Sequence, residues 1–206
     1  SFSGESNKLV VAGVDRRIRY FDPSQSRSPS STALASTTAL EPDALLTLDG
    51  HTQAITGLIF TDDDSTVYST SADGTINKWQ IPESEALTLT RGHSAQVYAL
   101  AFSPHGKLLA SGSSDKTVRL WRSTQSDEIP SKVISNQEGA LYSLQFSPDG
   151  KFLLTAGADG TVRLLDPREP REIRRYETPG DCLYSAVFSP DGKRIAAAGQ
   201  GPGRER

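Results

Sequence analysis

Apolar and polar residues alternate with a period of two along much of the chain. In residues 97–102, VYALAF, positions 98, 100 and 102 fall on one face and positions 97, 99 and 101 on the other. Residues 117–121, TVRLW, alternate in the same way, and no segment keeps a sustained helical period. A period of two is that of the β-strand, whose side chains point to opposite faces in turn. The pattern therefore predicts an all-β chain of short strands.

Turn sequences separate these strands, and they recur at nearly constant intervals. Ser-Pro-x-Gly turns begin at Ser103, Ser147 and Ser189, and tighter Asp-Gly turns stand at 73–74 and 159–160. The phenylalanines that end matching strands are Phe60, Phe102, Phe146 and Phe188, spaced by 42, 44 and 42 residues. The intervals His51–Trp79, His93–Trp121 and Gln137–Leu165 are each 28 residues. Such recurrence predicts repeated four-stranded antiparallel sheets.

The repeated unit resembles the WD repeat. A Gly-His pair stands at one end and a Trp at the other, from Gly50-His51 to Trp79 and from Gly92-His93 to Trp121. The resemblance implies a β-propeller of four-stranded antiparallel WD-repeat blades, about four of them present, within a larger ring of the seven-bladed type. It also implies a non-catalytic scaffold that binds a partner protein or peptide on the top face, around the central channel.

The whole chain, 1–206, is then expected to be one propeller segment. Residues 8–51 supply a partial blade with strands at 8–13, 17–22 and 45–49 and a flexible insertion at 23–43, rich in Ser, Thr, Ala and Pro. Full blades are expected at 54–92, 96–136 and 140–178, and a partial blade at 182–199. The insertion can serve as a phosphorylated or partner-binding loop, or it can be a tolerated surface loop.

The strand count leaves the closure of the ring open. The expected strands number seventeen, with three in the first blade, twelve in the three full blades and two in the last. At four strands per blade this makes four blades and one extra strand. An unclosed ring exposes edges that allow self-association. The absence of Met and the strand-breaking tail 201–206 favour a longer ring whose other blades are missing here. Two copies can instead join into one ring, or residues 182–189 can pair with 8–13, displace 193–199 and close four blades.

The resemblance assigns two polar tetrads. They are His51, Ser69, Asp73 and Trp79 in one blade, and His93, Ser111, Asp115 and Trp121 in the next. In each tetrad the indole N–H donates to the hydroxyl, which meets the imidazole, which meets the carboxylate, so that groups buried between blades are paired. A Ser, a His and an Asp also suggest a hydrolase. However, the set repeats in each blade, no Gly-x-Ser-x-Gly elbow is present, and both serines should be buried, so we predict no catalytic residue.

Two other blades keep the aspartate and lose the tetrad. The matched positions are Gln137, Thr155, Asp159 and Leu165 in one blade, and Val11, Asp15 and Phe21 in the first. Gln137 can replace some of the hydrogen bonding, but Leu165 offers no donor, so these blades are expected to lose the network and to be less rigid.

The resemblance also places a binding surface on the top face. The residues expected at the rim of the channel are Thr56, Tyr98, Tyr142 and Tyr184, and those just before the turn aspartates are Val14, Ala72, Ser114 and Ala158. Tyrosine suits interfaces because it offers a large rigid ring with a hydroxyl, and the small neighbours leave room for an inserted side chain. The alternative is that the tyrosines only pack on one another and plug the channel.

Composition narrows the partners further. With 22 basic and 25 acidic residues, a net charge of −3 and no basic stripe, nothing predicts a nucleic-acid or membrane partner. No apolar run approaches the roughly 20 residues of a membrane helix. The single cysteine, Cys182, forms no intrachain disulfide and is compatible with the cytoplasm, the compartment we favour. Two of three histidines belong to tetrads, so no metal site or cofactor is expected.

Two functions are alternatives to the interaction scaffold. Some propellers of other families are enzymes, but they need convergent carboxylates or a metal in the channel, and this rim offers tyrosines and small residues. The other alternative is that this propeller is one domain of a larger enzyme or regulatory protein with catalysis outside the segment. The identity of the partner does not follow from the sequence.

Overall fold

The structure, a computed structural model, describes residues 8–22, 46–61, 64–81, 86–122, 130–135, 137–169, 171–178 and 182–201. These residues form strands joined by turns and contain no helix, which confirms the all-β prediction. The insertion expected at 23–43 lies outside the described residues.

The strands form five antiparallel sheets in chain order. The first sheet holds β1 (Leu9–Ala12), β2 (Arg17–Phe21) and β3 (Leu46–Asp49). The second holds β4 (Ile55–Phe60), β5 (Thr66–Ser71), β6 (Thr75–Gln80) and β7 (Ala86–Arg91). The third holds β8 (Val97–Phe102), β9 (Leu108–Ser113), β10 (Val118–Arg122) and β11 (Lys132–Ile134). The fourth holds β12 (Leu141–Phe146), β13 (Leu153–Gly157), β14 (Thr161–Asp166) and β15 (Arg171–Glu177), and the fifth holds β16 (Cys182–Phe188) and β17 (Ile195–Gln200).

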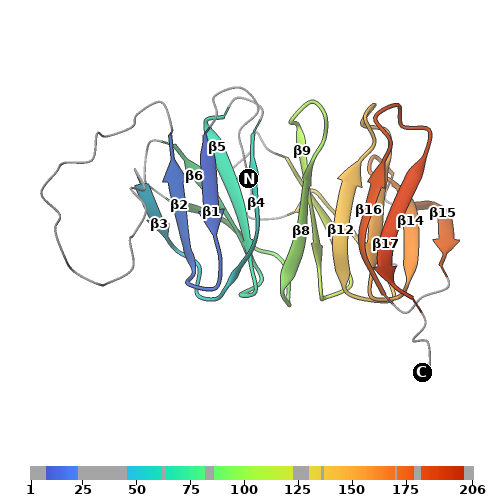
Figure 1. Ribbon diagram of the computed structural model, residues 1–206, viewed down its shortest axis with the longest axis horizontal. Helices are drawn as coiled ribbons and strands as arrows, with labels where there is room; N and C mark the ends of the chain where they lie inside the picture. The colour runs from blue at the N-terminus through green and yellow to red at the C-terminus, as the bar shows by residue number, and fades with distance from the viewer. Residues whose placement is uncertain are drawn as a thin grey trace, which may run out of the picture.

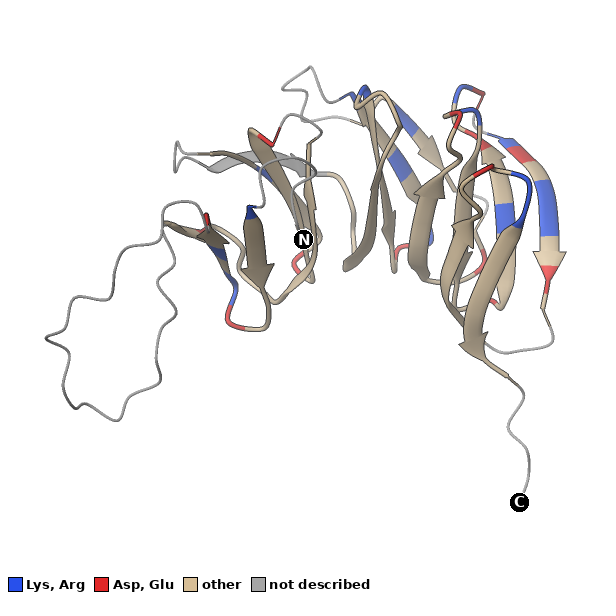
Figure 2. Cartoon of the chain, turned by 45° about the horizontal axis from the view of Figure 1, so that its top comes forward, with Lys and Arg blue, Asp and Glu red and all other residues tan. Residues whose placement is uncertain are grey.

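The sheets stand side by side along an open arc, which is the arrangement of propeller blades (Figures 1 and 2). The strands β4, β8, β12 and β16 are neighbours in one row, and β1 adjoins β4. We call this row the inner strands. The structure does not adopt the alternative of a four-bladed closure, because β16 pairs with β17 and not with β1, and the first and fifth sheets lie at opposite ends of the arc. Association of two copies through the open edges stays a prediction.

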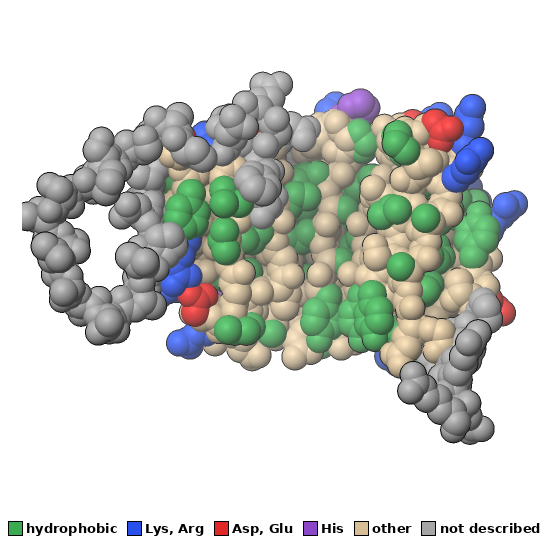
Figure 3. Space-filling model, in the orientation of Figure 1, with side chains coloured by type: hydrophobic (Ala, Val, Ile, Leu, Met, Phe, Trp, Pro, Cys, Tyr) green, Lys and Arg blue, Asp and Glu red, His purple; other side chains and the backbone are tan. Residues whose placement is uncertain are grey.

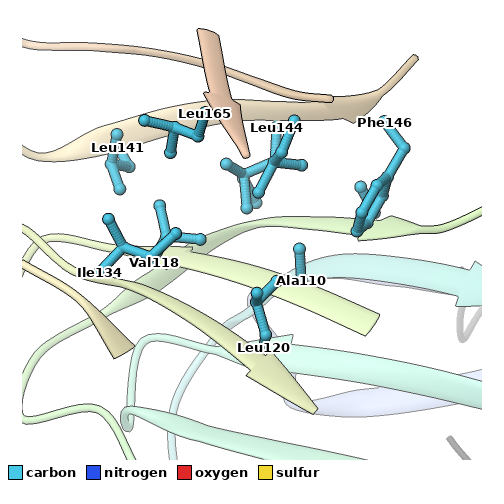
Figure 4. Close-up of a cluster of buried hydrophobic side chains, with 11 residues drawn as sticks. Ala110, Val118, Leu120, Ile134, Leu141, Leu144, Phe146 and Leu165 are labelled. Atoms are coloured by element: carbon cyan, nitrogen blue, oxygen red, sulfur yellow. The ribbon is translucent and has the colours of Figure 1, made fainter. Parts of the chain in front are cut away.

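Apolar side chains fill the spaces between neighbouring sheets. Between the third and fourth sheets, Val118, Leu120 and Ile134 face residues of the fourth sheet (Figure 4). Those residues are Leu141, Leu144, Phe146, Leu153 and Leu165. Because both faces of a middle sheet are covered, its second strand (β5, β9 or β13) is buried on both sides, whereas β15 at the outer edge is exposed. Removing this apolar surface from water is the main favourable contribution to stacking the sheets.

The second to fifth sheets share an irregularity at the start of the inner strand. The register between the inner strand and its neighbour shifts between Ile55 and Gly57, Val97 and Ala99, Leu141 and Ser143, and Leu183 and Ser185. Each shift leaves one extra residue on the inner strand, as a β-bulge does. In the fourth sheet the two neighbouring backbone segments approach so closely here that a Cβ on Gly157 would collide with the Ala140 carbonyl oxygen.

We predict that Gly157→Ala lowers the free energy of unfolding by about 1–3 kcal/mol, because the added methyl group has no space beside the bulge. Gly13→Ala is the matched control, since a Cβ there meets nothing within 4 Å. Urea denaturation of both variants measures the difference. Equal stability of the two variants would contradict the close approach.

Candidate protein-binding face

The β-bulges position the four residues predicted for the rim. Thr56, Tyr98, Tyr142 and Tyr184, here called the rim residues, are each the extra residue at a register shift. A bulge interrupts the alternation of the strand and re-aims one side chain. The same device therefore recurs in four successive sheets and sets the direction of one side chain in each.

The three rim tyrosines form a continuous row across three sheets. The ring centroids of Tyr98 and Tyr142 lie 5.4 Å apart, and those of Tyr142 and Tyr184 lie 5.8 Å apart. Both separations are within the range of favourable ring contacts. Tyr98 and Tyr142 are half-buried, whereas Tyr184 is 56% exposed. In the space-filling view, hydrophobic side chains gather at the lower part of the face that β12 and its neighbouring strands form (Figure 3).

Hydroxyl contacts hold the ends of the row. The Tyr98 hydroxyl donates to Gln96 Oε1 at 2.8 Å, and the Tyr184 hydroxyl donates to Gln200 Oε1 at 3.4 Å. The neighbouring Cys182 thiol raises the pKa of Tyr184 above 10.0, so this phenol stays protonated at neutral pH. Thr56 differs from the tyrosines, because its hydroxyl donates to the Val97 carbonyl oxygen of the next sheet. It serves as a link between two inner strands.

The residues before the turn aspartates lie beside the start of the inner strands. The amides of Ala72, Ser114 and Ala158 donate to the carbonyl oxygens of Ala54, Gln96 and Ala140 at 2.9, 2.9 and 2.8 Å. Each acceptor precedes a rim residue by two positions. Ala72, Ser114 and Ala158, here called the turn residues, are half-buried. Val14 of the first sheet is 88% exposed. The rim residues and the turn residues thus share one edge of the sheets, which we call the binding face.

Both predicted tetrads have continuous hydrogen-bond chains. Trp79 Nε1 donates to Ser69 Oγ at 2.8 Å, Ser69 Oγ lies 2.7 Å from His51 Nε2, and His51 Nδ1 lies 3.3 Å from Asp73 Oδ2. In the third sheet the corresponding distances among Trp121, Ser111, His93 and Asp115 are 2.9, 2.8 and 2.8 Å. Ser69 and Ser111 are both 0% exposed, so substrate cannot reach either hydroxyl.

The lowered pKa values of the two tetrad histidines indicate where the protons of each tetrad lie. Burial lowers the pKa of both His51 and His93 below 6.5, against the attraction of Asp73 and Asp115. At neutral pH each imidazole is therefore neutral, and Nδ1–H donates to the carboxylate while Nε2 accepts from the serine. Burial opposes the ionisation of Asp73, but hydrogen bonds from Thr75 and the Thr52 amide outweigh it and lower its pKa to about 2.

The fourth sheet has a different network, which the sequence pattern did not predict. Arg163 is 1% exposed, and its guanidinium pairs with Asp159 Oδ2 at 2.6 Å and with Glu172 Oε2 at 3.2 Å. Glu138 is a further partner at 3.6 Å. Thr155 Oγ1 also donates to Gln137 Oε1 at 3.3 Å. Gln137 thus replaces part of the hydrogen bonding, as the sequence indicated. The expected loss of a network is corrected by Arg163, which connects loop, turn and outer strand where the tetrad is absent.

A sequence signal for this arginine exists. An arginine follows the turn aspartate by four positions in three of the four repeats that carry that aspartate, as Arg19, Arg119 and Arg163. In the first sheet Arg19 Nη1 lies 2.5 Å from Asp15 Oδ2. In an isolated strand, residues four apart lie on the same face, so the spacing itself indicates the ion pair.

Other kinds of site find no support in the described part of the chain. Among those residues, no three His, Cys, Asp or Glu side chains come together to hold a metal ion. The same residues include no helix long and apolar enough to span a membrane.

Four-stranded sheets on an open arc, with a Trp–Ser–His–Asp chain between neighbours, define a WD-type β-propeller. Three segments, residues 43–80, 84–122 and 129–166, match the family of the WD domain, G-beta repeat. Together they cover more than half of the chain, so the chain belongs to the WD40 family. Repeats of this family are protein-interaction modules and generally non-catalytic, which gives the chain its general role as an interaction scaffold.

Individual relatives match shorter stretches. Pre-mRNA-processing factor 19 of Homo sapiens is 29% identical over 80 residues, which is 39% of this chain and 13% of that protein, and the Bos taurus protein gives the same figures. Ribosome biogenesis protein YTM1 of Phaeosphaeria nodorum is 31% identical over 100 residues, covering 40% of this chain and 21% of that protein. The matches thus span a small part of these relatives.

We predict that His93→Ala or Asp115→Ala lowers the free energy of unfolding by about 1–3 kcal/mol, because buried partners lose their hydrogen bonds. Ser94→Ala is the control, since Ser94 is exposed and only its backbone amide contacts Asp115. Urea denaturation gives the comparison. Reaction of Ser111 with a serine-directed probe in the folded chain would contradict the structural role.

The lowered histidine pKa values predict a pH dependence. The unfolded chain binds protons on His51 and His93 near pH 6.5, whereas the folded chain binds them only at lower pH. Stability is therefore full above pH 6.5 and decreases as the pH falls below it. Thermal unfolding between pH 7.5 and 5.5 measures this decrease, which His51→Gln with His93→Gln should flatten. A melting temperature that rises on acidification in this range would refute the assignment.

Proposed function

We propose that this chain is a non-catalytic scaffold that binds a partner protein or peptide on the binding face, through the rim tyrosines and the turn residues. The observation that carries the proposal is the row of Tyr98, Tyr142 and Tyr184, each set on a β-bulge of successive inner strands. The same residues on ordinary strand positions would alternate into the spaces between sheets.

The row has the properties of a protein contact surface. Each ring is braced by its neighbour, so little side-chain freedom is lost when a partner covers it. A tyrosine ring offers apolar area and a hydroxyl together, and this combination is common among energetically important interface residues. Beside the row, the small turn residues Ala72, Ser114 and Ala158 leave space for side chains of a partner.

The alternative, that the tyrosines only pack together, explains the ring contacts but not the place of each ring on a bulge. The 56% exposure of Tyr184 reflects its place in the fifth sheet, beside which the described residues form no further sheet, and so does not distinguish the two uses. A residue that serves packing alone gains nothing from a bulge that turns it out of the core. We therefore favour partner binding as the use of this row.

The partner's identity and the role of any larger protein are a separate matter. The relatives are named for pre-mRNA processing and for ribosome biogenesis, and the WD repeats match only a part of each. We propose that this chain is likewise the interaction part of a larger protein, and that any catalysis would lie outside this segment.

We predict that Tyr98→Ala and Tyr142→Ala each weaken binding by about 1 kcal/mol or more while leaving the melting temperature nearly unchanged. Peptides selected on the immobilised chain from a random library supply the ligand, and calorimetry measures affinity. Tyr176→Ala on the outer strand β15 is the matched control, because this tyrosine is 37% exposed and lies outside the row. Loss of stability without loss of affinity would mean that the row only packs.

A further inference from the structure

The second sheet departs from the other sheets at one repeated position. Four residues after the turn aspartate, the first, third and fourth sheets carry Arg19, Arg119 and Arg163, whereas the second sheet carries Asn77. Each arginine lies near its own aspartate. The closest distances are 2.5 Å from Arg19 to Asp15, 3.8 Å from Arg119 to Asp115 and 2.6 Å from Arg163 to Asp159. Asn77 ends in an uncharged amide, so the second sheet has no guanidinium at this position beside Asp73.

A polar pocket of about 400 Å³ lies at this departure. Gly50, Thr52, Asp73, Gly74, Thr75, Asn77 and His93 line it. Its place in the repeat follows from the next sheet, where Gly92 is the equivalent of Gly50. A Cβ on Gly92 would lie 3.5 Å from Arg119 Nη1, so in that sheet an arginine lies beside the equivalent glycine. The pocket in the second sheet therefore lies at the position that the Arg119 guanidinium occupies in the third sheet.

The lining of the pocket presents acceptors that lack a cationic partner. Asn77 is 1% exposed, and its Oδ1 has no hydrogen-bond partner. Such a buried, unpaired acceptor costs free energy unless a donor reaches it. Among the side chains that the structure describes, which do not include those of 86–91, Asp73 has no lysine or arginine within ion-pair distance, and its imidazole partner is His51. His51 is neutral at pH 7 and Asp73 is ionised, since burial lowers the pKa of the first and hydrogen bonds lower that of the second. None of the described side chains compensates this negative charge with a cation.

We propose that this pocket binds the guanidinium of an arginine side chain from the protein or peptide on the binding face. The inference rests on the proposed function, and it names one anchor residue of the partner. The guanidinium would lie between Asp73 and Asn77 Oδ1, as the chain's own arginines lie in the other sheets. An arginine suits the site better than a lysine, because its planar fork of N–H donors can reach a carboxylate and an amide oxygen together.

The pocket adjoins the binding face. Ala72, a turn residue, directly precedes Asp73, and its amide donates to the carbonyl oxygen of Ala54, two residues before the rim residue Thr56. Asp115 accepts from His93, the Ser94 amide and Thr117 and still has Arg119 nearby. Asp73 accepts from the matching groups and, in addition, from the Thr52 hydroxyl at 3.3 Å, which an incoming guanidinium would displace. The hydrogen bonds already made by Asp73 therefore do not exclude a guanidinium.

The first test compares two probes on the unaltered chain. Acetyl-Gly-Arg-Gly-amide and its citrulline counterpart, which has nearly the same shape but no charge, are titrated while the amide NMR signals of Thr52, Gly74 and Thr75 are followed. The arginine probe should shift these signals saturably, and the citrulline probe should bind at least roughly tenfold more weakly. Equal effects of the two probes, or shifts only elsewhere, would overturn the proposal.

The second test fills the pocket from within. Asn77→Arg should weaken binding of the arginine probe by roughly tenfold or more, because the new guanidinium takes the place beside Asp73. Lys78→Arg is the matched control, since it adds a guanidinium at the adjacent position, on the opposite side of β6, and should leave probe binding unchanged. If Asn77→Arg fails to fold, the comparison of the two probes on the unaltered chain still decides.

Failure of this inference can be told from failure of the proposed function. Tyr98→Ala should weaken library-selected peptides and leave the arginine probe unaffected. If Tyr98→Ala weakens those peptides but the arginine probe never binds, the arginine pocket is wrong and the binding face stands. If the arginine probe binds and Tyr98→Ala leaves the selected peptides unaffected, the pocket stands and the tyrosine row is wrong.

Discussion

Polar groups buried between neighbouring sheets must be paired, and the rest of the structure depends on how each sheet meets this requirement. Ser69 and Ser111 are wholly buried, and each lies between an indole and an imidazole. The imidazole in turn contacts the turn aspartate, which also accepts from the Thr75 or Thr117 amide and so holds the tight turn. The turn then bonds to the start of the inner strand through Ala72 and Ser114. Pairing of buried groups thus fixes the loop, the turn and the edge that carries the binding face.

Much of the fold followed from local patterns. The alternation of apolar residues placed the strands, Ser-Pro-x-Gly and Asp-Gly placed the turns, and the spacing of His51 to Trp79 indicated the repeat. The rim residues were reached only through the family resemblance, because a β-bulge depends on how two strands pair and leaves no mark in either strand alone. Arg163 was missed for another reason. The spacing from Asp159 marks the ion pair, but the burial of Arg163 also needs Glu172 and Glu138, which come from an outer strand and a loop and which only the folded chain brings near.

The sheets use one backbone plan with different polar chemistry. The second sheet joins loop and turn through His51, the third through His93 with Arg119 near the same carboxylate, and the fourth through Arg163. All three solutions keep the aspartate, because its hydrogen bonds to the turn backbone do not depend on which cation or imidazole faces it. Variation is therefore tolerated at the histidine and arginine positions, and where both a histidine and an asparagine occur, as at His51 and Asn77, a polar pocket remains open. Differences between repeats, on a constant backbone, thus give each sheet its own set of buried polar contacts.

The most direct test of this account is hydrogen–deuterium exchange of the full chain with and without a library-selected peptide. If the bulged inner strands and tight turns form the binding face, protection should appear at residues 72–75, 95–98, 139–142 and 182–184, where turn and rim residues share one edge. The outer strands β7, β11 and β15 should exchange as in the free chain. Protection confined to those outer strands, with the inner-strand bulges unchanged, would contradict the central claim that the repeated bulge builds the binding face.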